Sequence, residues 1–285
     1  MHKVVVATDL SARSHRAVRR AVLLARASGA EITLLHVVDD DQPDRMIDAE
    51  RAVAEELLAD QARSLIELDA VSCRHEVALG EPFEAIARLA TRQAADVVVI
   101  GQHRRAILRD FFLGTTAERT IRTAQLPVLM VSTAPAGPYR AVLAASDLSD
   151  AAAGALATAA SLGLTRDALV AVLHAFVPLA RTMLARAAMA PDDALVAGQA
   201  ETASAAAELD AHLATWADAP DQRLVWPAPA GAAAAVCEAA RNLHADLVVI
   251  GTRQHPALQE MLLGSVSGEV LRYAPCDVLA VPPGR

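Results

Sequence analysis

The two halves of the chain carry the same landmarks in the same order, and this limits the folds open to it. Residues 8–11, Thr-Asp-Leu-Ser, correspond to residues 146–149, Ser-Asp-Leu-Ser, at an offset of 147 − 9 = 138. His36 and His174, each inside an apolar run, keep this offset, because 174 − 36 is also 138. Self-similarity at a constant spacing indicates one structural unit that occurs twice.

Later landmarks repeat at a larger offset, which predicts an insertion in the second half. Asp246 corresponds to Asp96 at 246 − 96 = 150, so the offset has grown by 12 since His174. We place the extra residues in 178–191 and expect them to form a helical segment. The chain then divides into a first domain, a linker rich in proline and alanine, and a second domain, over residues 1–133, 134–139 and 140–285.

Strand and helix patterns alternate along each half. Apolar runs, typical of strands buried on both faces, alternate with amphipathic stretches. In the first half, strands are expected over 3–8, 32–38, 71–79, 96–101 and 128–132, and helices over 12–28, 44–68, 82–94 and 115–124. We therefore predict an α/β fold of two tandem five-stranded parallel sheets, each doubly wound in a Rossmann-like or flavodoxin-like manner with helices on both faces.

A loop bounded by glycines follows the fourth expected strand of each half. The strand that ends at Gly101 is followed by Gly114, and the strand that ends at Gly251 by Gly264, so both spacings are 13. Glycine lets backbone approach a ligand closely, and a helix that begins after the second glycine offers free N–H groups to an anion. Ligands of such sheets bind beyond the carboxyl ends of strands, where the strand order reverses. The loops therefore indicate a phosphate site; the alternative is a strand, a loop and a capped helix that bind nothing.

Composition restricts the partners and the compartment. A net charge of −8 and a pI of about 5.6 argue against a general nucleic-acid-binding surface. The three cysteines form no C-x-x-C pair, which favours a reducing cytoplasm over a disulfide framework. No apolar run approaches the ~20 residues of a membrane span, and the N-terminus lacks the pattern of a signal peptide. We expect a cytoplasmic protein that contacts neither nucleic acid nor membrane.

No pattern in the sequence nominates catalytic or metal chemistry. His, Cys, Asp and Glu show no metal-ligand spacing, so no dedicated metal site is predicted, and the Gly-x4-Gly-Lys-[Ser/Thr] loop of P-loop hydrolases is absent. His36 and His174 are expected to be hydrogen-bonded core residues, and Asp9 and Asp147 to be helix caps or ribose contacts. We predict a protein that is not an enzyme, with slow ATP hydrolysis left open.

Taken in order, and twice, these motifs resemble the universal stress protein family in its tandem two-domain form. The resemblance rests on the aspartate after strand one, Leu-His-Val in strand two, Gly80-x-Pro82, the Val-Val-Ile-Gly strand and the Pro-Val-Leu-Met-Val run at 127–131. It covers essentially the whole chain. It implies a stress-response protein whose two domains pair through their fifth strands, 128–132 and 278–281. We also expect the whole chain to form a homodimer.

The resemblance also implies a nucleotide motif, because family members that bind ATP share Gly-x2-Gly-x9-Gly-[Ser/Thr]. The first glycine falls on Gly101 and Gly251, and the third on Gly114 and Gly264.

Both halves depart from that motif at its second glycine, which is replaced by Arg104 and by Gln254. If this position needs a positive φ, a side chain there costs about 1 kcal/mol and also takes up room. Arg104 offers a guanidinium that pairs with phosphate, whereas Gln254 offers only hydrogen bonds. The departure favours loss of the ligand, and the retained third glycine favours its presence.

By resemblance, two sets of residues would contact the base, the ribose and the phosphates. In the first half they are Asp9, Val37, Gly101, His103, Arg104, Gly114, Thr115 and Thr116. In the second half they are Asp147, Ala175, Gly251, Gln254, Gly264, Ser265 and Ser267. The implied function is binding of ATP, accompanied by Mg²⁺, or of another adenine nucleotide. The alternative is an interaction scaffold that binds no nucleotide and acts through protein partners.

Overall fold

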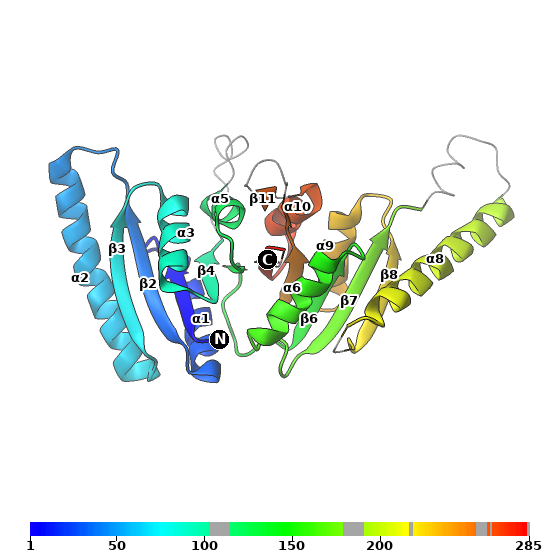
Figure 1. Ribbon diagram of the computed structural model, residues 1–285, viewed down its shortest axis with the longest axis horizontal. Coiled ribbons are helices and arrows are strands. Elements are labelled where there is room, and N and C mark those ends of the chain that lie inside the picture. Colours follow the sequence, from blue (N-terminus) through cyan, green and yellow to red (C-terminus); the bar gives the residue numbers. More distant parts are fainter. Residues whose placement is uncertain (103–114, 179–190, 217–218, 255–260, 263, 284–285) are drawn as a thin grey trace.

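Strands and helices alternate along the chain (Figure 1), of which the computed structural model describes residues 1–102, 115–178, 191–216, 219–254, 261–262 and 264–283. In the first half the strands are β1 (Lys3–Ala7), β2 (Glu31–Val38), β3 (Cys73–Leu79), β4 (Val97–Gly101) and β5 (Val128–Val131). The helices of this half are α1 (Ser14–Ser28), α2 (Asp44–Asp69), α3 (Pro82–Gln93) and α5 (Thr116–Thr123).

The second half repeats this order. Its strands are β6 (Ala141–Ser146), β7 (Leu169–Phe176), β8 (Gln222–Pro227), β9 (Leu247–Gly251) and β12 (Asp277–Val281). Its helices are α6 (Asp150–Ser161), α8 (Pro191–Leu213), α9 (Ala232–Asn242) and α10 (Ser265–Tyr273). Two short strands, β10 (Arg253–Gln254) and β11 (Met261–Leu262), pair with each other outside the main sheet.

One ten-stranded sheet runs through the molecule in the order β3-β2-β1-β4-β5-β12-β9-β6-β7-β8. Each half contributes five parallel strands, and the halves join where β5 and β12 pair antiparallel, with Leu129 opposite Leu279. The predicted α/β fold is confirmed, and the fifth strands pair as expected. Their pairing hydrogen-bonds two edges that would otherwise be open to other chains.

Helices cover both faces of this sheet, as doubly wound topology requires. Alternate residues of the strands, such as Val4 and Val6, pack with α1, α2, α6 and α8 in one apolar cluster. The residues between them, such as Val5, pack with α3, α5, α9 and α10 in the other cluster. Both clusters run through both halves, so the two repeats share one continuous core on each face.

The boundaries differ from the predicted ones at a few ends. Helix α1 begins at Ser14 rather than at residue 12, because the chain first makes a turn in which Leu10 has a positive φ of 59°. The predicted insertion at 178–191 lies almost entirely outside the described residues.

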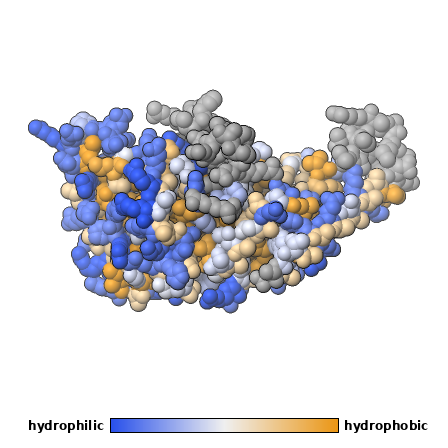
Figure 2. Space-filling model, in the orientation of Figure 1, coloured by the Kyte–Doolittle hydropathy of each residue, from blue (hydrophilic) through white to orange (hydrophobic). Residues whose placement is uncertain are grey.

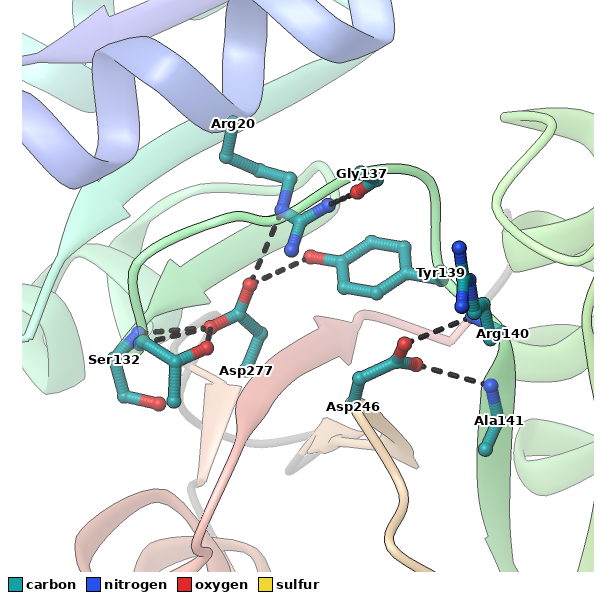
Figure 3. Close-up of polar contacts among 9 residues, drawn as sticks. Arg20, Ser132, Gly137, Tyr139, Arg140, Ala141, Asp246 and Asp277 are labelled. Atoms are coloured by element: carbon teal, nitrogen blue, oxygen red, sulfur yellow. Dashed lines mark hydrogen bonds and ion pairs between the residues drawn. The ribbon is translucent and has the colours of Figure 1, made fainter.

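The repeated aspartates at the start of β4 and β9 hold the first strand of each half. Asp96 accepts hydrogen bonds from the N–H groups of His2 and Lys3. Asp246 accepts them from Arg140 and from Ala141 (Figure 3). These landmarks of the repeat are therefore structural and lie away from the carboxyl ends of the strands.

A buried aspartate ties the two halves to the linker (Figure 3). Asp277, which is fully buried, accepts hydrogen bonds from the N–H groups of Ser132 and Thr133 and from the hydroxyl of Tyr139 at 2.8 Å. It also pairs with Arg20, whose guanidinium lies 3.9 Å from the centroid of the Tyr139 ring. Since Arg20 is on α1 and Asp277 on β12, this network fixes how the repeats meet.

The surface differs between the two ends of the molecule. Figure 2 shows hydrophilic side chains gathered over the α2 end. Over α6 and α8 it shows paler side chains, which are neither strongly hydrophilic nor strongly hydrophobic. Helices α6 and α8 are rich in alanine, which explains the paler surface.

Candidate functional site

A cavity lies at the carboxyl ends of the first and fourth strands of each half. The first cavity, with a volume of about 180 Å³, is lined by the ends of β1, β2 and β4, by α3 and α5, and by the turn into α1. The second cavity, with a volume of about 300 Å³, is lined by the corresponding segments of the second half. Both lie where the topology of a doubly wound sheet predicts a ligand.

The first cavity brings together four residues that the sequence nominated: Asp9, Val37, Gly101 and Thr116. Thr115 is not among the residues that line it, because its side chain caps α5. The other three nominated residues, His103, Arg104 and Gly114, lie outside the described residues.

The second cavity brings together six of the seven residues nominated in that half. They are Asp147, Ala175, Gly251, Gly264, Ser265 and Ser267. The seventh, Gln254, lies in β10 with its backbone paired opposite Met261.

Several polar residues that the motif does not include also line the cavities. In the first cavity they are Thr8, Arg13, Ser14, His36 and Gln102, and in the second they are Ser146, Ser149, His174 and Thr252. Most of them are next to a nominated residue in the sequence. They could therefore have been predicted from their position at the same strand ends. Arg13 had no such signal, because its counterpart in the second half is an alanine, Ala151 (13 + 138 = 151).

Asp9 and Asp147 shape the turn that follows the first strand of each half. The Oδ1 atom of Asp9 accepts a hydrogen bond from the N–H of Ser11 at 3.0 Å, and Oδ1 of Asp147 accepts one from the N–H of Ser149 at 3.2 Å. Each carboxylate thus stabilises a turn of the kind that aspartate favours. Neither aspartate is the N-cap of the next helix, which corrects one of the two roles expected for them.

The turn also keeps the first carboxylate ionised. Burial raises the pKa of Asp9, but hydrogen bonds from Ser11 and Ser14 outweigh it, and the net pKa lies below the ordinary value. Asp9 is therefore an anion at neutral pH and acts as a hydrogen-bond acceptor toward anything in the first cavity.

The two repeated histidines are anchored to the backbone of the neighbouring strand. The Nδ1 atom of His36 lies 2.9 Å from the carbonyl oxygen of Thr8, and Nδ1 of His174 lies 3.0 Å from that of Ser146. A carbonyl only accepts, so Nδ1 carries the proton. The expectation of hydrogen-bonded histidines is confirmed, although both also line a cavity.

The first motif glycine of each half is required by helix packing. A Cβ on Gly101 would lie 3.2 Å from Cα of Ser14, and one on Gly251 would lie 3.0 Å from the carbonyl oxygen of Ala151. Both distances are shorter than ordinary contacts, so a side chain would push away the start of α1 or α6. Glycine here serves a close approach between backbones, whereas the sequence suggested a close approach to a ligand. Gly264 differs, because a Cβ there would meet no atom of the described residues within 4 Å.

Helix α5, beside the first cavity, is capped by its own residues. The hydroxyl of Thr115 accepts a hydrogen bond from the N–H of Glu118, and the Glu118 carboxylate accepts one from the N–H of Thr115 at 3.2 Å. The same carboxylate pairs with Arg272 of α10 at 2.7 Å, and its side chain is only 4% exposed. A buried anion thus already occupies the N-terminus of α5, where it satisfies the helix dipole.

Helix α10, beside the second cavity, lacks such a cap among the described side chains. Its N-cap residue is Gly264, and no side-chain hydrogen bond caps the helix there. Ser267 donates its hydroxyl hydrogen bond away from the helix, to the carbonyl oxygen of Gly251 at 3.2 Å. Gly264, Ser265 and Ser267 all line the second cavity, so the first turn of α10 presents its N–H groups there.

The described residues offer no protein site for a metal ion. No three His, Cys, Asp or Glu side chains among them cluster closely enough to hold one. None of the described helices is long and apolar enough to cross a membrane.

Comparison with known proteins agrees with this fold. The model of the universal stress protein family matches residues 1–132 and again residues 138–282. The universal stress protein MJ0531 of Methanocaldococcus jannaschii is 31% identical over 138 residues, which cover 45% of this chain and 81% of that protein.

Two solved structures have the same tandem architecture. A universal stress protein from Archaeoglobus fulgidus superposes with a TM-score of 0.70 at 20% identity, covering 99% of this chain and 98% of that one. A putative universal stress protein from Pseudomonas aeruginosa superposes with a TM-score of 0.61 at 22% identity, covering 99% and 94% of the two chains.

A doubly wound α/β unit that occurs twice, with a cavity at the same strand ends each time, defines a tandem protein of the Rossmann-like class. The two matches of the family model extend over nearly all of the sequence. The chain belongs to the universal stress protein family.

Proposed function

We propose that this universal stress protein binds an adenine nucleotide in the second cavity, with the phosphates at the N-terminus of α10. The observation that supports the proposal is the first turn of α10, which no described side chain caps and which lines the larger of the two cavities. Free N–H groups and the positive end of the helix dipole attract phosphate. The hydroxyl of Ser265, the first residue of α10, lies at the same end of the cavity and offers a further donor.

Other residues of the second cavity suit a nucleoside. Asp147 and Ala175 line it, and by family resemblance these positions contact the ribose and the base. The carboxylate of Asp147 accepts hydrogen bonds, as ribose hydroxyls require, and Ala175 leaves room for a flat base. Among the described residues no acidic cluster holds a metal, so Mg²⁺ would be carried by the phosphates of ATP.

The first cavity is less suited to a triphosphate. Its volume is smaller, at about 180 Å³ against 300 Å³. The Glu118 carboxylate, which pairs with Arg272, also accepts the N–H of Thr115, so a phosphate at α5 would find that donor already used. We therefore assign the ATP site to the second half alone.

The proposed role is binding rather than catalysis, with the nucleotide controlling the conformation or the associations of a cytoplasmic, dimeric protein. The second candidate role is a scaffold that binds no nucleotide and acts through protein partners. One observation favours it: Gln254 replaces the second motif glycine and lies in a strand pair, β10 with β11.

Calorimetry with two matched variants tests the proposal. Gly264→Arg places a large side chain in the second cavity, and Gly154→Arg places the same side chain on the exposed face of α6, where no described atom lies within 4 Å of an added Cβ. We expect micromolar binding of ATP by the wild type and by Gly154→Arg, and none by Gly264→Arg. No heat at millimolar ATP with the wild type would reject the nucleotide proposal and leave the scaffold.

A further inference from the structure

A third cavity lies between the two repeats, at the amino ends of the strands. Its volume is about 220 Å³, which exceeds that of the first cavity. Helix α1 lines one side and the turn at 162–168, which follows α6, lines the other, while Pro138 and Tyr139 of the linker complete the lining. Because both repeats and the linker contribute, this cavity is a product of the tandem arrangement. It is separate from the glycine loops and from the carboxyl ends of the strands.

The two helices beside the third cavity differ in length. At the offset of 138 the last residue of α1, Ser28, corresponds to residue 166, whereas α6 already ends at Ser161. Gly163 follows with a positive φ of 76°, which takes the chain out of the helix. The chain continues as a turn, and Arg166 and Asp167 of this turn line the cavity. The second repeat therefore places two charged residues where the first repeat completes a helix.

Leucines from both repeats make much of this lining apolar. They are Leu23 and Leu24 of α1 and Leu162 and Leu164 of the turn. Arg20 also lines the cavity, but its guanidinium is already paired with Asp277 at 3.3 Å (Figure 3). An apolar cavity of about 150 Å³ is large enough to bind benzene. The third cavity therefore has room for one aliphatic or aromatic side chain together with a small polar group.

Charges of both signs lie beside the leucines. Arg166 and Asp167 are exposed, and neither side chain pairs with another described residue. A guanidinium binds a carboxylate through two parallel hydrogen bonds, and a carboxylate accepts hydrogen bonds from an ammonium group. The C-terminal residues of α1 and α6, Ser28 and Ser161, also line the cavity, and the negative ends of helix dipoles favour a cation. The lining thus suits a ligand that carries an anion, a cation and an apolar body.

We propose that the third cavity binds a free amino acid with an apolar side chain. The carboxylate of the ligand pairs with Arg166, its ammonium group with Asp167, and its side chain packs against the four leucines. Since the ligand contacts both repeats and binds only the folded chain, it stabilises the junction between them. The proposal goes beyond the proposed function, because it requires no nucleotide in either of the other cavities.

Calorimetry on the full chain tests the proposal, with leucine, methionine and phenylalanine as probes. We expect saturable binding at one site per chain and a higher Tm in the presence of the ligand. Two analogues of leucine separate its charges: 4-methylpentanoate lacks the ammonium group, and 3-methylbutylamine lacks the carboxylate. Each should bind about tenfold or more weakly than leucine, because one charge-assisted contact is lost. No binding of any of the three amino acids at millimolar concentration would overturn the proposal.

Variants assign the two charges and the cavity. Arg166→Ala should weaken leucine about tenfold and leave 3-methylbutylamine unchanged, whereas Asp167→Ala should weaken leucine and leave 4-methylpentanoate unchanged. Ala27→Trp, at an exposed position of the lining, fills the cavity and should abolish binding. Arg122→Ala, exposed and on α5, is the control and should bind leucine as the wild type does.

Equal leucine affinity in the wild type and in Ala27→Trp would place the ligand elsewhere and overturn the proposal. ATP binding, measured separately in the same proteins, reports on the proposed function and should not change in any of these variants. Failure of the third cavity and failure of the nucleotide site are therefore distinguishable.

Discussion

The Nε atom of Arg20 lies 3.3 Å from Oδ2 of Asp277, and the two side chains are only 4% and 0% exposed. The pair joins α1 of the first repeat to β12 of the second. Burial, and then the charge of Asp277, raise the pKa of Tyr139 well above its ordinary value, so its hydroxyl remains a donor to that carboxylate. The junction between the repeats therefore depends on one buried carboxylate of the second repeat, which is held by residues of the first repeat and by Tyr139 of the linker.

Asp277→Ala is expected to destabilise the protein by about 3–5 kcal/mol, because it leaves the Arg20 guanidinium buried without a countercharge. Urea unfolding followed by circular dichroism measures this change in the free energy of unfolding. Asp60→Ala is the control, since Asp60 forms an exposed pair with Arg63 and should matter by less than about 1 kcal/mol. Equal effects of the two substitutions would show that the buried network does not stabilise the junction.

Arg272→Ala should destabilise the protein by about 2 kcal/mol, less than a fully buried pair, because Arg272 is 40% exposed. The substitution leaves the Glu118 carboxylate buried without the guanidinium with which it pairs. The corresponding residue of the first repeat, Arg122 (272 − 150), is exposed and serves as the control. Arg122→Ala should be nearly neutral in the same urea titration, and a comparable loss in both variants would contradict this account.

Two glycines of the same motif should respond differently to alanine. A Cβ on Gly251 would lie 3.0 Å from the carbonyl oxygen of Ala151, so Gly251→Ala should cost about 1–3 kcal/mol through overpacking. Gly264→Ala adds a methyl group that meets no described residue within 4 Å, at a φ of −56°, so the stability of this variant should stay within about 0.5 kcal/mol of the wild type. Thermal unfolding of both variants measures the two changes in stability. A loss of stability in Gly264→Ala equal to that in Gly251→Ala would refute the packing explanation.

The native thiols should be unreactive. Burial raises the pKa of Cys73 and of Cys276 from 9.0 to about 12, and it raises that of Cys237 as well. Ellman's reagent at pH 8 should therefore titrate no thiol in the folded protein and three after denaturation. Because these folded pKa values are raised, their contribution to stability is present below pH 9 and is lost as the pH rises toward 12. A rapidly reacting native thiol would contradict the buried assignment.

The repeat and the fold could be predicted because both depend on patterns among residues that are close together in the sequence. Apolar strands such as β4 and β9, buried on both faces, read directly as parallel strands. The position of the cavities followed from topology alone. Asp9 and Asp147 were correctly placed at those strand ends, although as turn-forming residues.

The differences between the two cavities were not predictable, because they depend on contacts between distant residues. Glu118 caps α5 by accepting a hydrogen bond from Thr115, three residues away, but its ion-pair partner Arg272 is 154 residues away. Arg13 interrupts the repeat, so a search for corresponding landmarks passes over it. The role of Gly251 also required the structure, because the backbone that approaches it belongs to α6.

The measurement that tests the account most directly is where a photoreactive ATP analogue attaches. The full chain is labelled with 8-azido-ATP, with excess ATP as competitor, and the labelled peptides are identified by mass spectrometry. We predict label near Ala175 on β7, which ATP suppresses, and little label near Val37 on β2. Label confined to β2, or labelling that ATP does not suppress, would contradict the assignment of the ATP site to the second repeat.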